Sequence, residues 1–138
     1  TSDAFLSNLS RKQAKLFDGV RCDSGDEFEF TEKLIARYKE FGIDPTTKTI
    51  IFSNALNFPK ALDIQQFCQG RIRCAFGIGT NLTNDTGFTP SNIVMKLTRC
   101  RMNNNQEWHE CVKLSDDEGK HLGSSMEVKA CLYELQLG

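Results

Sequence analysis

Two stretches of the chain each place a short apolar run before an amphipathic helical pattern. Residues 15–22 carry the first apolar run, and residues 24–42 repeat apolar positions at the spacing of one helix face. Residues 48–53 are apolar and rich in β-branched side chains, residues 57–70 form a second helical pattern, and residues 71–76 a third apolar run. This order predicts parallel strands joined by right-handed crossovers.

Both expected helices have recognisable ends. In the first helix, Ser24 is expected to cap the opening turn and Gly42 to adopt the left-handed conformation that stops it. In the second, Asn57 is the expected N-cap and Pro59 fits the first turn. The apolar stripe of the first helix consists of Phe30, Leu34, Tyr38 and Phe41.

The pattern changes after residue 90. Residues 92–100 alternate, and residues 108–115 follow a polar turn, which predicts an antiparallel hairpin. Residues 124–136 then predict a closing helix, with Ser124 and Glu127 spaced as a capping box. The apolar positions assigned to one hairpin face are Ile93, Met95 and Leu97, and those facing inward from the helix are Val128, Cys131, Leu132 and Leu135.

Three parallel strands are too few for a closed barrel, which takes eight strands and roughly 250 residues. The edge strands of such a small open sheet need neighbours. We therefore expect an α/β chain that is the last part of a larger unit. Its predicted domains are 1–90, with the parallel strands, and 91–138, with the hairpin and closing helix.

The composition indicates an ordinary globular protein. The 138 residues are 39% hydrophobic and 25% charged, with a net charge of −1. A protein with this net charge lacks the positive electrostatic potential that attracts nucleic acids and anionic membranes. We therefore predict neither a nucleic-acid nor a membrane partner. The beginning of the chain lacks the apolar core of a signal peptide and lacks an initiator methionine, so we expect a cytoplasmic protein and a processed or engineered piece.

The six cysteines allow two interpretations. They would suit three disulfides in a small secreted domain. No pair, however, has the two-residue spacing of a zinc or redox motif, and four lie in apolar runs. We favour free thiols that act as small hydrophobic side chains in a reducing compartment.

Polar and glycine-rich loops follow the three expected strands. Parallel strands end along one edge, and ligands bind at that edge in open α/β sheets and barrels. Arg21 and Asp23 follow the first strand, where an arginine can hold an anion and a carboxylate can accept from ribose hydroxyls or help to hold Mg²⁺. A helix start explains the neighbouring Ser24 and Asp26 but not these two residues, so we favour a functional role for them.

The other two loops are ambiguous by themselves. Ser53 and Asn54 could bind a sugar or form an ordinary loop. Gly77, Gly79 and the Thr80 hydroxyl could make a phosphate-binding turn, although a simple turn explains a single Gly-x-Gly equally well. The two histidines, at positions 109 and 121, have no nucleophile at a suggestive spacing and are interpreted as surface or packing residues.

Taken together, the motifs resemble those of a known family. The stretches GVRCDSGD, IIFSNALN and AFGIGTNLTND, followed by NIVMKLTRC and VKLSDDEGKHLG, resemble the C-terminal part of nicotinate phosphoribosyltransferases. The resemblance covers nearly the whole chain, in order and with matching spacing. It implies the C-terminal part of an irregular (β/α) barrel, followed by a hairpin and helix that return to a second, sheet-containing domain.

The resemblance implies an enzyme of NAD biosynthesis. Nicotinate attacks C1 of phosphoribosyl pyrophosphate, pyrophosphate leaves, and nicotinate mononucleotide forms. In this family ATP hydrolysis helps to drive the reaction through a phosphorylated histidine in many members, and Mg²⁺ balances the charge of the pyrophosphate. A homodimer is expected of the full-length enzyme.

Site residues follow from the same resemblance. It implies that the backbone of Gly79 and Thr80 holds the 5′-phosphate, that Gly77 shapes the turn, and that Arg21 lies beside the pyridine ring and the phosphates.

The resemblance further implies that Asp23 faces the ribose and, indirectly, Mg²⁺, while Ser53 and Asn54 contact the ribose. An amide at position 54 can bind a hydroxyl but cannot help to hold a cation.

The family's phosphorylated histidine and the residues that bind the nicotinate carboxylate lie upstream of this chain. We therefore expect no catalytic residue in this chain and no turnover by it alone, and we expect it to assemble with the remainder of the enzyme. The alternative is a non-catalytic sugar-phosphate-binding or assembly module of the same fold.

Overall fold

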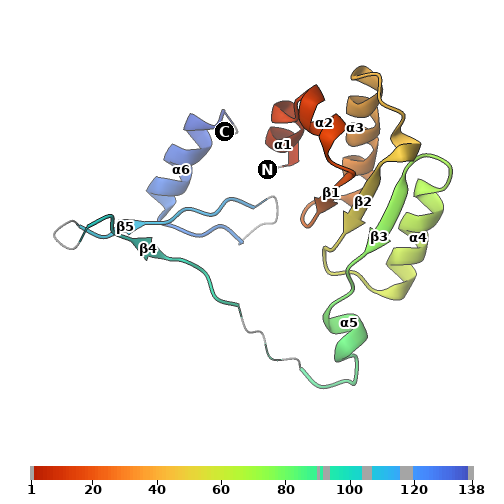
Figure 1. Ribbon diagram of the computed structural model, residues 1–138. Coiled ribbons are helices and arrows are strands. Elements are labelled where there is room, and N and C mark those ends of the chain that lie inside the picture. The colour runs from red at the N-terminus through yellow and green to blue at the C-terminus, as the bar shows by residue number, and fades with distance from the viewer. Residues whose placement is uncertain (1, 90, 92–93, 104–106, 116–119, 137–138) are drawn as a thin grey trace. The chain divides into compact units, whose positions relative to one another are not determined.

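The computed structural model describes residues 2–89, 91, 94–103, 107–115 and 120–136. Backbone contacts group the chain into two compact units, Ser2–Pro90 and Ser91–Gly138 (Figure 1). The predicted roles of the two domains are not tested by this division and stay predictions.

The first unit alternates helices and strands in the predicted order, with two additional helices at its beginning. Its elements are α1 (Ser2–Asn8), α2 (Arg11–Leu16), β1 (Gly19–Cys22), α3 (Glu27–Glu40), the 3-10 turn η1 (Pro45–Thr47), β2 (Thr49–Phe52), α4 (Phe58–Cys68), β3 (Arg73–Phe76) and α5 (Thr80–Thr83).

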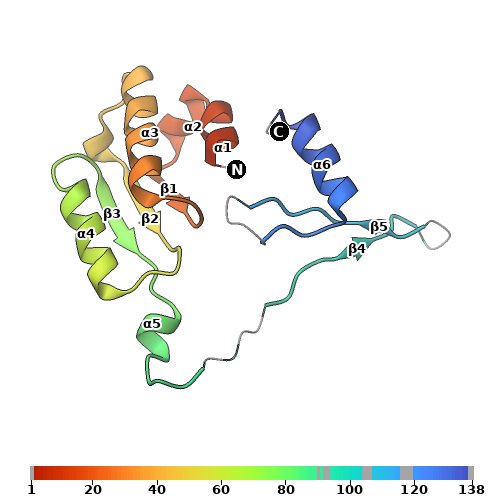
Figure 2. The ribbon, with the colours of Figure 1, turned by 180° about the vertical axis from the view of Figure 1, so that it is seen from behind.

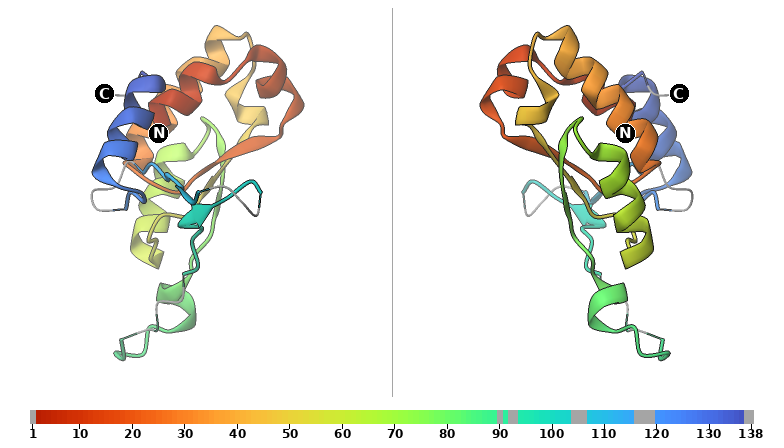
Figure 3. Two further views of the ribbon diagram at one scale, coloured as in Figure 1. Left: turned by 90° about the vertical axis from the view of Figure 1, so that its left-hand side faces the viewer. Right: turned by 90° about the vertical axis from the view of Figure 1, so that its right-hand side faces the viewer.

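The three strands form a parallel sheet in the order β1-β2-β3, which confirms the predicted topology. Val20, Ile50 and Cys74 are register partners across the sheet. Figure 3 shows α3 and α4 on the same face, as right-handed crossovers require. Ile50 and Phe52 point toward these helices and are fully buried, so the core of this unit lies between the helices and β2.

The opposite face of the sheet has no such cover among the described residues. Arg21, Ile51 and Ala75 share one row of this face, and Ile51 is 47% exposed although it lies on the central strand. Parallel sheets are normally covered on both faces. The exposed row therefore marks a face of the sheet that lacks the covering layer usual for parallel sheets.

The helix ends confirm most of the sequence predictions. Gly42 and Gly70 have φ values of 67° and 70°, the left-handed conformation that ends a helix. Asn57 caps α4 by accepting a hydrogen bond from the Lys60 amide at 2.9 Å. The prediction for Ser24 was wrong: Asp26 caps α3 by accepting from the Glu29 amide at 2.7 Å. An N-cap must directly precede the first helical turn, and α3 begins at Glu27.

The first strand is shorter than predicted because residues 11–16 are helical and β1 begins only at Gly19. A capping box explains the helix, since the Ser10 side chain accepts from the Gln13 amide and the Gln13 side chain accepts from the Ser10 amide. Lys48, only 8% exposed, donates from Nζ to the Phe17 carbonyl at 2.7 Å. A lysine from outside the helix thus satisfies a carbonyl at the end of α2.

The second unit contains the predicted hairpin in a shorter form. The strands β4 (Arg99–Cys100) and β5 (His109–Glu110) pair antiparallel, and an isolated bridge joins Lys113 and Leu122 (Figure 2). The predicted alternation of residues 92–98 produces no strand in its described part, and Met95 is 97% exposed. Ile93 lies outside the described residues. Alternation yields a strand only when another strand is available to pair with it.

The closing helix α6 (Ser125–Glu134) has half of its predicted capping box. The Ser124 side chain accepts from the Glu127 amide at 3.2 Å, but the Ser124 amide donates to Glu110 Oε2 rather than to Glu127. Val128, Cys131 and Leu132 are half-buried, whereas Leu135 is 55% exposed, which contradicts its inward assignment.

All six cysteines carry free thiols, as the favoured interpretation predicts, but only Cys22 and Cys68 are buried, so the expected role as hydrophobic side chains fits these two best. The reducing compartment stays a prediction. Within the described part of the chain, none of the helices is both long and apolar enough to cross a membrane.

The Gly19→Ala variant is expected to be destabilised by roughly 1–3 kcal/mol or more, in the range of overpacking. An added Cβ at position 19 would overlap the Thr49 carbonyl oxygen, and that oxygen is backbone held by the β1–β2 ladder. Urea denaturation measures the change in the free energy of unfolding. Gly79→Ala is the matched control, because nothing lies within 4 Å of a Cβ added there. Equal stability of the two variants would contradict the packing account.

Candidate functional site

The loops that follow the three strands start from one edge of the sheet. The backbone ladder continues past the strands at this edge: the Ser53 amide donates to the Cys22 carbonyl at 2.9 Å, and the Gly77 amide donates to the Phe52 carbonyl at 2.8 Å. Parallel pairing thus places the first residue after each strand beside its neighbour. The carboxyl edge of the sheet is the candidate site.

Arg21 connects the first loop to the second. Its Nε donates to Ser53 Oγ at 2.8 Å, and its Nη2 lies 3.5 Å from Asp23 Oδ2. The side chains of Arg21 and Asp23 are 62% and 57% exposed, so their ion pair is solvated and contributes little to stability. The hydrogen bond orients the guanidinium at the edge of the sheet, where it remains accessible to an anion.

Two asparagines tie the loops of this edge together. Asn54 Nδ2 donates to the Gly25 carbonyl at 3.3 Å, which joins the loops after β2 and β1. Asn81 Nδ2 donates to the Leu56 carbonyl at 2.8 Å, which joins α5 to the loop after β2. Between them, Ala55 has a φ of 46°, a left-handed conformation that is costly for a residue with a Cβ. The three loops therefore restrain one another without any ligand.

The two glycines after β3 serve different purposes. A Cβ at Gly77 would lie 3.3 Å from Ser53 Cβ, so Gly77 allows the chain to leave the sheet close to the second loop. A Cβ at Gly79 would meet nothing within 4 Å, so packing does not require glycine there. Among the described residues, the amides of Ile78, Gly79 and Thr80 have no recorded acceptor. These amides are available to a ligand.

The structure brings together most, not all, of the predicted site residues. Arg21 contacts both Asp23 and Ser53, and Asn54 and Gly77 adjoin them. Gly79 and Thr80 follow β3, whose carboxyl end lies at the same edge of the sheet. The described residues show no direct contact between these two residues and the Arg21–Asp23 pair.

Few of the described side chains at this edge could bind a metal ion. The described residues contain no group of three or more histidine, cysteine or acidic side chains that could hold a metal ion. Asp23 is a single carboxylate, and it is already beside Arg21. It could contact Mg²⁺ only together with oxygen ligands supplied by water or by a substrate.

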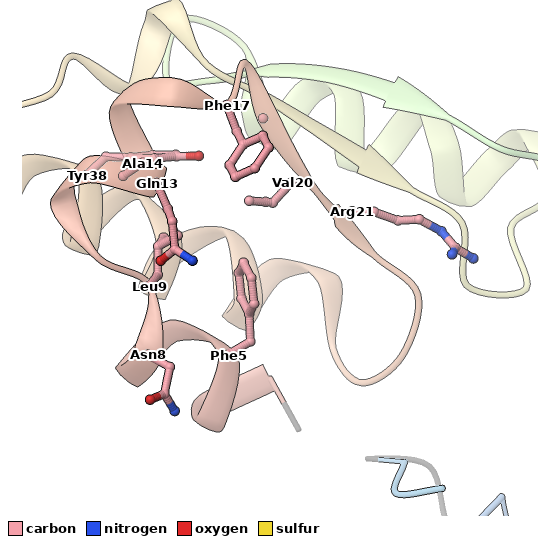
Figure 4. Close-up of a pocket in the computed structure, with 10 residues that line it drawn as sticks. Phe5, Asn8, Leu9, Gln13, Ala14, Phe17, Val20, Arg21 and Tyr38 are labelled. Atoms are coloured by element: carbon pink, nitrogen blue, oxygen red, sulfur yellow. The ribbon is translucent and has the colours of Figure 1, made fainter.

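A separate cavity of about 300 Å³ lies beside the outer edge of β1 (Figure 4). Its walls are mostly apolar and come from α1, α2, β1 and α3, with Phe5, Phe17 and Val20 around the space. Arg21 lies at its border, and burial raises the pKa of Tyr38 in its wall. Sequence reasoning did not identify this cavity, because the two helices that form it were not predicted; the Ser10–Gln13 capping box was the available signal.

A partly buried ion pair links two helices near the site. Glu27 in the first turn of α3 is 3% exposed, and its Oε1 lies 2.7 Å from Lys60 Nζ in the first turn of α4. Nothing in the sequence around Glu27 indicates a partner so far along the chain. The pair joins the starts of the two helices that follow the first two site loops.

Replacing Lys60 with Met is expected to destabilise the chain by about 1–3 kcal/mol, because Glu27 would keep a buried charge without its partner. The double variant Glu27→Gln with Lys60→Met is expected to recover most of that loss. Thermal denaturation of the two single variants and the double variant measures the coupling between the side chains. Additive losses would contradict a direct interaction.

Among the described residues, neither histidine has a recorded hydrogen bond to a nucleophilic side chain. His121 Nδ1 accepts a hydrogen bond from the Ser115 amide at 3.4 Å, and His109 is exposed on β5. This is consistent with their interpretation as surface or packing residues.

Comparison with known proteins gives a consistent result. The model of the nicotinate phosphoribosyltransferase (NAPRTase) family matches residues 1–134. A nicotinate phosphoribosyltransferase from Desulforapulum autotrophicum is 51% identical over all 138 residues, which are 36% of its own length. One from Chromohalobacter salexigens is 54% identical over 123 residues, 89% of this chain and 31% of that protein.

Solved structures agree with these relatives. Nicotinate phosphoribosyltransferase from Porphyromonas gingivalis matches with a TM-score of 0.88 and 50% identity, over 99% of this chain and 36% of that one. The enzyme from Vibrio cholerae matches with a TM-score of 0.83 and 35% identity, over 99% and 33%. These likenesses confirm the predicted fold class. The chain spans about a third of the length of the relatives it matches.

Proposed function

Because the chain belongs to the nicotinate phosphoribosyltransferase family, we propose that it carries the phosphoribosyl-binding part of an enzyme that makes nicotinate mononucleotide. In this reaction the ring nitrogen of nicotinate attacks C1 of phosphoribosyl pyrophosphate, the C1–O bond to pyrophosphate breaks, and pyrophosphate leaves. The protein's tasks are to hold the phosphate, ribose and ring in line and to stabilise the charge that develops.

The turn after β3 is proposed to bind the 5′-phosphate. The amides of Ile78, Gly79 and Thr80 have no recorded acceptor in the described part of the chain, and Gly79 leaves open space where a side chain would stand. Backbone amides that converge on one space form a site for phosphate oxygens. The Thr80 hydroxyl adds a further donor.

Arg21 is proposed to contact the phosphates and the pyridine ring. Its charge balances the anionic substrate, and its planar guanidinium suits both phosphate and aromatic surfaces. Ser53 Oγ holds Arg21 Nε at 2.8 Å, so the side chain keeps its direction before the substrate arrives.

Ser53, Asn54 and Asp23 are proposed to face the ribose. A hydroxyl, an amide and a carboxylate supply the acceptors and donors that sugar hydroxyls require. Mg²⁺ would neutralise charge on the leaving pyrophosphate and would be held by its oxygens, with Asp23 in contact through water.

The remaining features of the proposal concern a longer protein. Coupling to ATP hydrolysis, binding of the nicotinate carboxylate and a homodimer are all proposed for the full-length enzyme, and none is assigned to residues of this chain. The single observation that carries the proposal is the meeting of Arg21, Asp23 and Ser53 at the edge from which the Gly77–Thr80 turn also departs.

The chain alone is expected to form no nicotinate mononucleotide, whereas mixing it with the preceding part of a family enzyme is expected to restore product formation. Chromatography of the product after incubation with nicotinate, phosphoribosyl pyrophosphate, ATP and Mg²⁺ measures this. Turnover by the isolated chain would overturn the assignment. Saturable binding of phosphoribosyl pyrophosphate without product in the assembled protein would instead support the non-catalytic binding module.

Gly79→Val is expected to raise KM for phosphoribosyl pyrophosphate at least ~10-fold in the assembled enzyme, because the added side chain would occupy the proposed phosphate space. The stability of the chain should change little, since that space is empty of protein. Initial rates at varied substrate concentration give KM. Leu82→Ala is the matched control, because Leu82 lies in α5, directly after this turn, and is 57% exposed. An unchanged KM in Gly79→Val would remove the turn from the site.

A further inference from the structure

Among the described residues, one recorded side-chain hydrogen bond ties the short helix α5 to another element. Asn81 Nδ2 donates to the Leu56 carbonyl oxygen at 2.8 Å, although the two residues are 25 positions apart. The Thr83 hydroxyl, by contrast, donates within the same turn, to the Gly79 carbonyl at 3.2 Å. Figure 1 shows α5 beyond the carboxyl end of β3. A helix of four residues is not stable by itself, so tertiary contacts must set its direction.

The acceptor of this hydrogen bond is itself well anchored. Leu56 is 2% exposed and belongs to the core cluster of its unit. Two residues earlier, Asn54 Nδ2 donates to the Gly25 carbonyl at 3.3 Å, and Ala55 between them has a φ of 46°. A buried side chain and a bond between loops therefore hold the Leu56 carbonyl in place. Asn81 donates to a partner that is already fixed.

The turn before α5 is held at both of its ends. Ile78 is partly buried and packs against the core cluster. Gly79 and Thr80 thus lie between two attachments, the Ile78 side chain before them and the Asn81 side chain after them. The Gly79 carbonyl accepts from the Leu82 amide at 2.9 Å and so points into α5. Because the carbonyl and the amide of one peptide point in opposite directions, the Thr80 amide points out of the helix.

We propose that Asn81 is a positioning residue for the 5′-phosphate of phosphoribosyl pyrophosphate, an inference that rests on the phosphate role proposed above for the turn. By holding α5 against the loop after β2, Asn81 keeps the Gly79 and Thr80 amides in the directions that phosphate oxygens require. It acts through these amides and not on the reacting atoms. Without its hydrogen bond the turn samples other directions, and part of the binding energy is lost in ordering it.

The effect of this residue should be confined to one end of the substrate. The 5′-phosphate takes no part in the bond changes at C1, so its contacts stabilise the bound substrate and the transition state alike. Loss of such contacts raises KM and leaves kcat unchanged. Ribose 5-phosphate carries the 5′-phosphate, whereas pyrophosphate does not. Weaker inhibition by ribose 5-phosphate alone therefore distinguishes positioning of this phosphate from a general loosening of the site.

Asn81→Leu removes the donor and keeps the approximate size of the side chain. In the enzyme assembled from this chain and the preceding part of a family enzyme, it is expected to raise KM for phosphoribosyl pyrophosphate about 5-fold, the factor that one net hydrogen bond contributes. The inhibition constant of ribose 5-phosphate should rise by about the same factor. The inhibition constant of pyrophosphate, KM for nicotinate and kcat should stay within about 2-fold. Initial rates at varied substrate and inhibitor concentrations give all five constants.

Two further variants isolate the hydrogen bond. Asn81→Gln keeps an amide donor on a longer side chain and should restore most of the affinity for phosphoribosyl pyrophosphate. Asn84→Leu is the matched control, because the recorded partner of the Asn84 side chain is Thr86 of the same segment, whose hydroxyl donates to Asn84 Oδ1 at 3.2 Å. Asn84→Leu should leave every constant unchanged.

The 138-residue chain gives a second measurement that needs no assembly with another part. Nitrogen-15 relaxation measures how rigidly each backbone amide is held. The order parameters of the Gly79 and Thr80 amides should lie near about 0.85, the value for rigid backbone, and should fall toward about 0.6 in Asn81→Leu. They should not change in Asn84→Leu. Equal order parameters in Asn81→Leu and the unmodified chain would contradict the positioning role.

The kinetic outcomes separate this inference from the one beneath it. If Gly79→Val raises KM for phosphoribosyl pyrophosphate and Asn81→Leu does not, the turn binds the phosphate without help from Asn81, and the positioning role is wrong. If Gly79→Val leaves KM unchanged, the phosphate role of the turn is wrong and the positioning role is lost with it. Equal weakening of ribose 5-phosphate and pyrophosphate, or the same effect in Asn84→Leu, would also overturn the positioning role.

Discussion

The parallel hydrogen bonding of β2 to both of its neighbours positions the loops of the candidate site. Ile50 and Phe52 of β2 are fully buried against the helices, and their strand is paired on both sides. A shift of one residue would turn these side chains away from the core, so the hydrophobic pattern specifies the register strongly. That register brings the ends of all three strands to one edge, with Arg21 beside Ser53.

The loops at this edge are ordered by the protein itself. Arg21 donates to Ser53, Asn54 to the Gly25 carbonyl and Asn81 to the Leu56 carbonyl, so each loop is tied to a neighbour. Ala55 keeps an unfavourable left-handed conformation within this arrangement. Order of this kind lowers the entropy that a ligand must remove on binding. In the proposed site, more of the binding energy would therefore remain available to position the reacting groups.

The two units expose different apolar surfaces. The first unit exposes Ile51 on the uncovered face of its sheet, and the second exposes Met95 and Leu97 before its hairpin. Relatives of this chain are almost three times as long, since it spans 36% of one of them. Exposed apolar positions on a central strand are surfaces that additional layers of an α/β protein normally cover.

The sequence by itself determined the order of strands and helices in the first unit, their parallel direction, the ends of α4 and the identity of the family. These features depend on local periodicity, capping chemistry and motif spacing, all of which can be seen in consecutive residues. Local signals gave a wrong prediction where two residues could serve as the helix cap. Ser24 was predicted to cap α3, but Asp26 does so. Only the tertiary structure decided that Lys48 donates to a carbonyl at the end of α2 and that Glu27 pairs with Lys60. The same holds for the absence of a strand at residues 94–98. Each of these depends on a partner distant in the sequence, and no pattern within one segment reveals which distant group will pack against it.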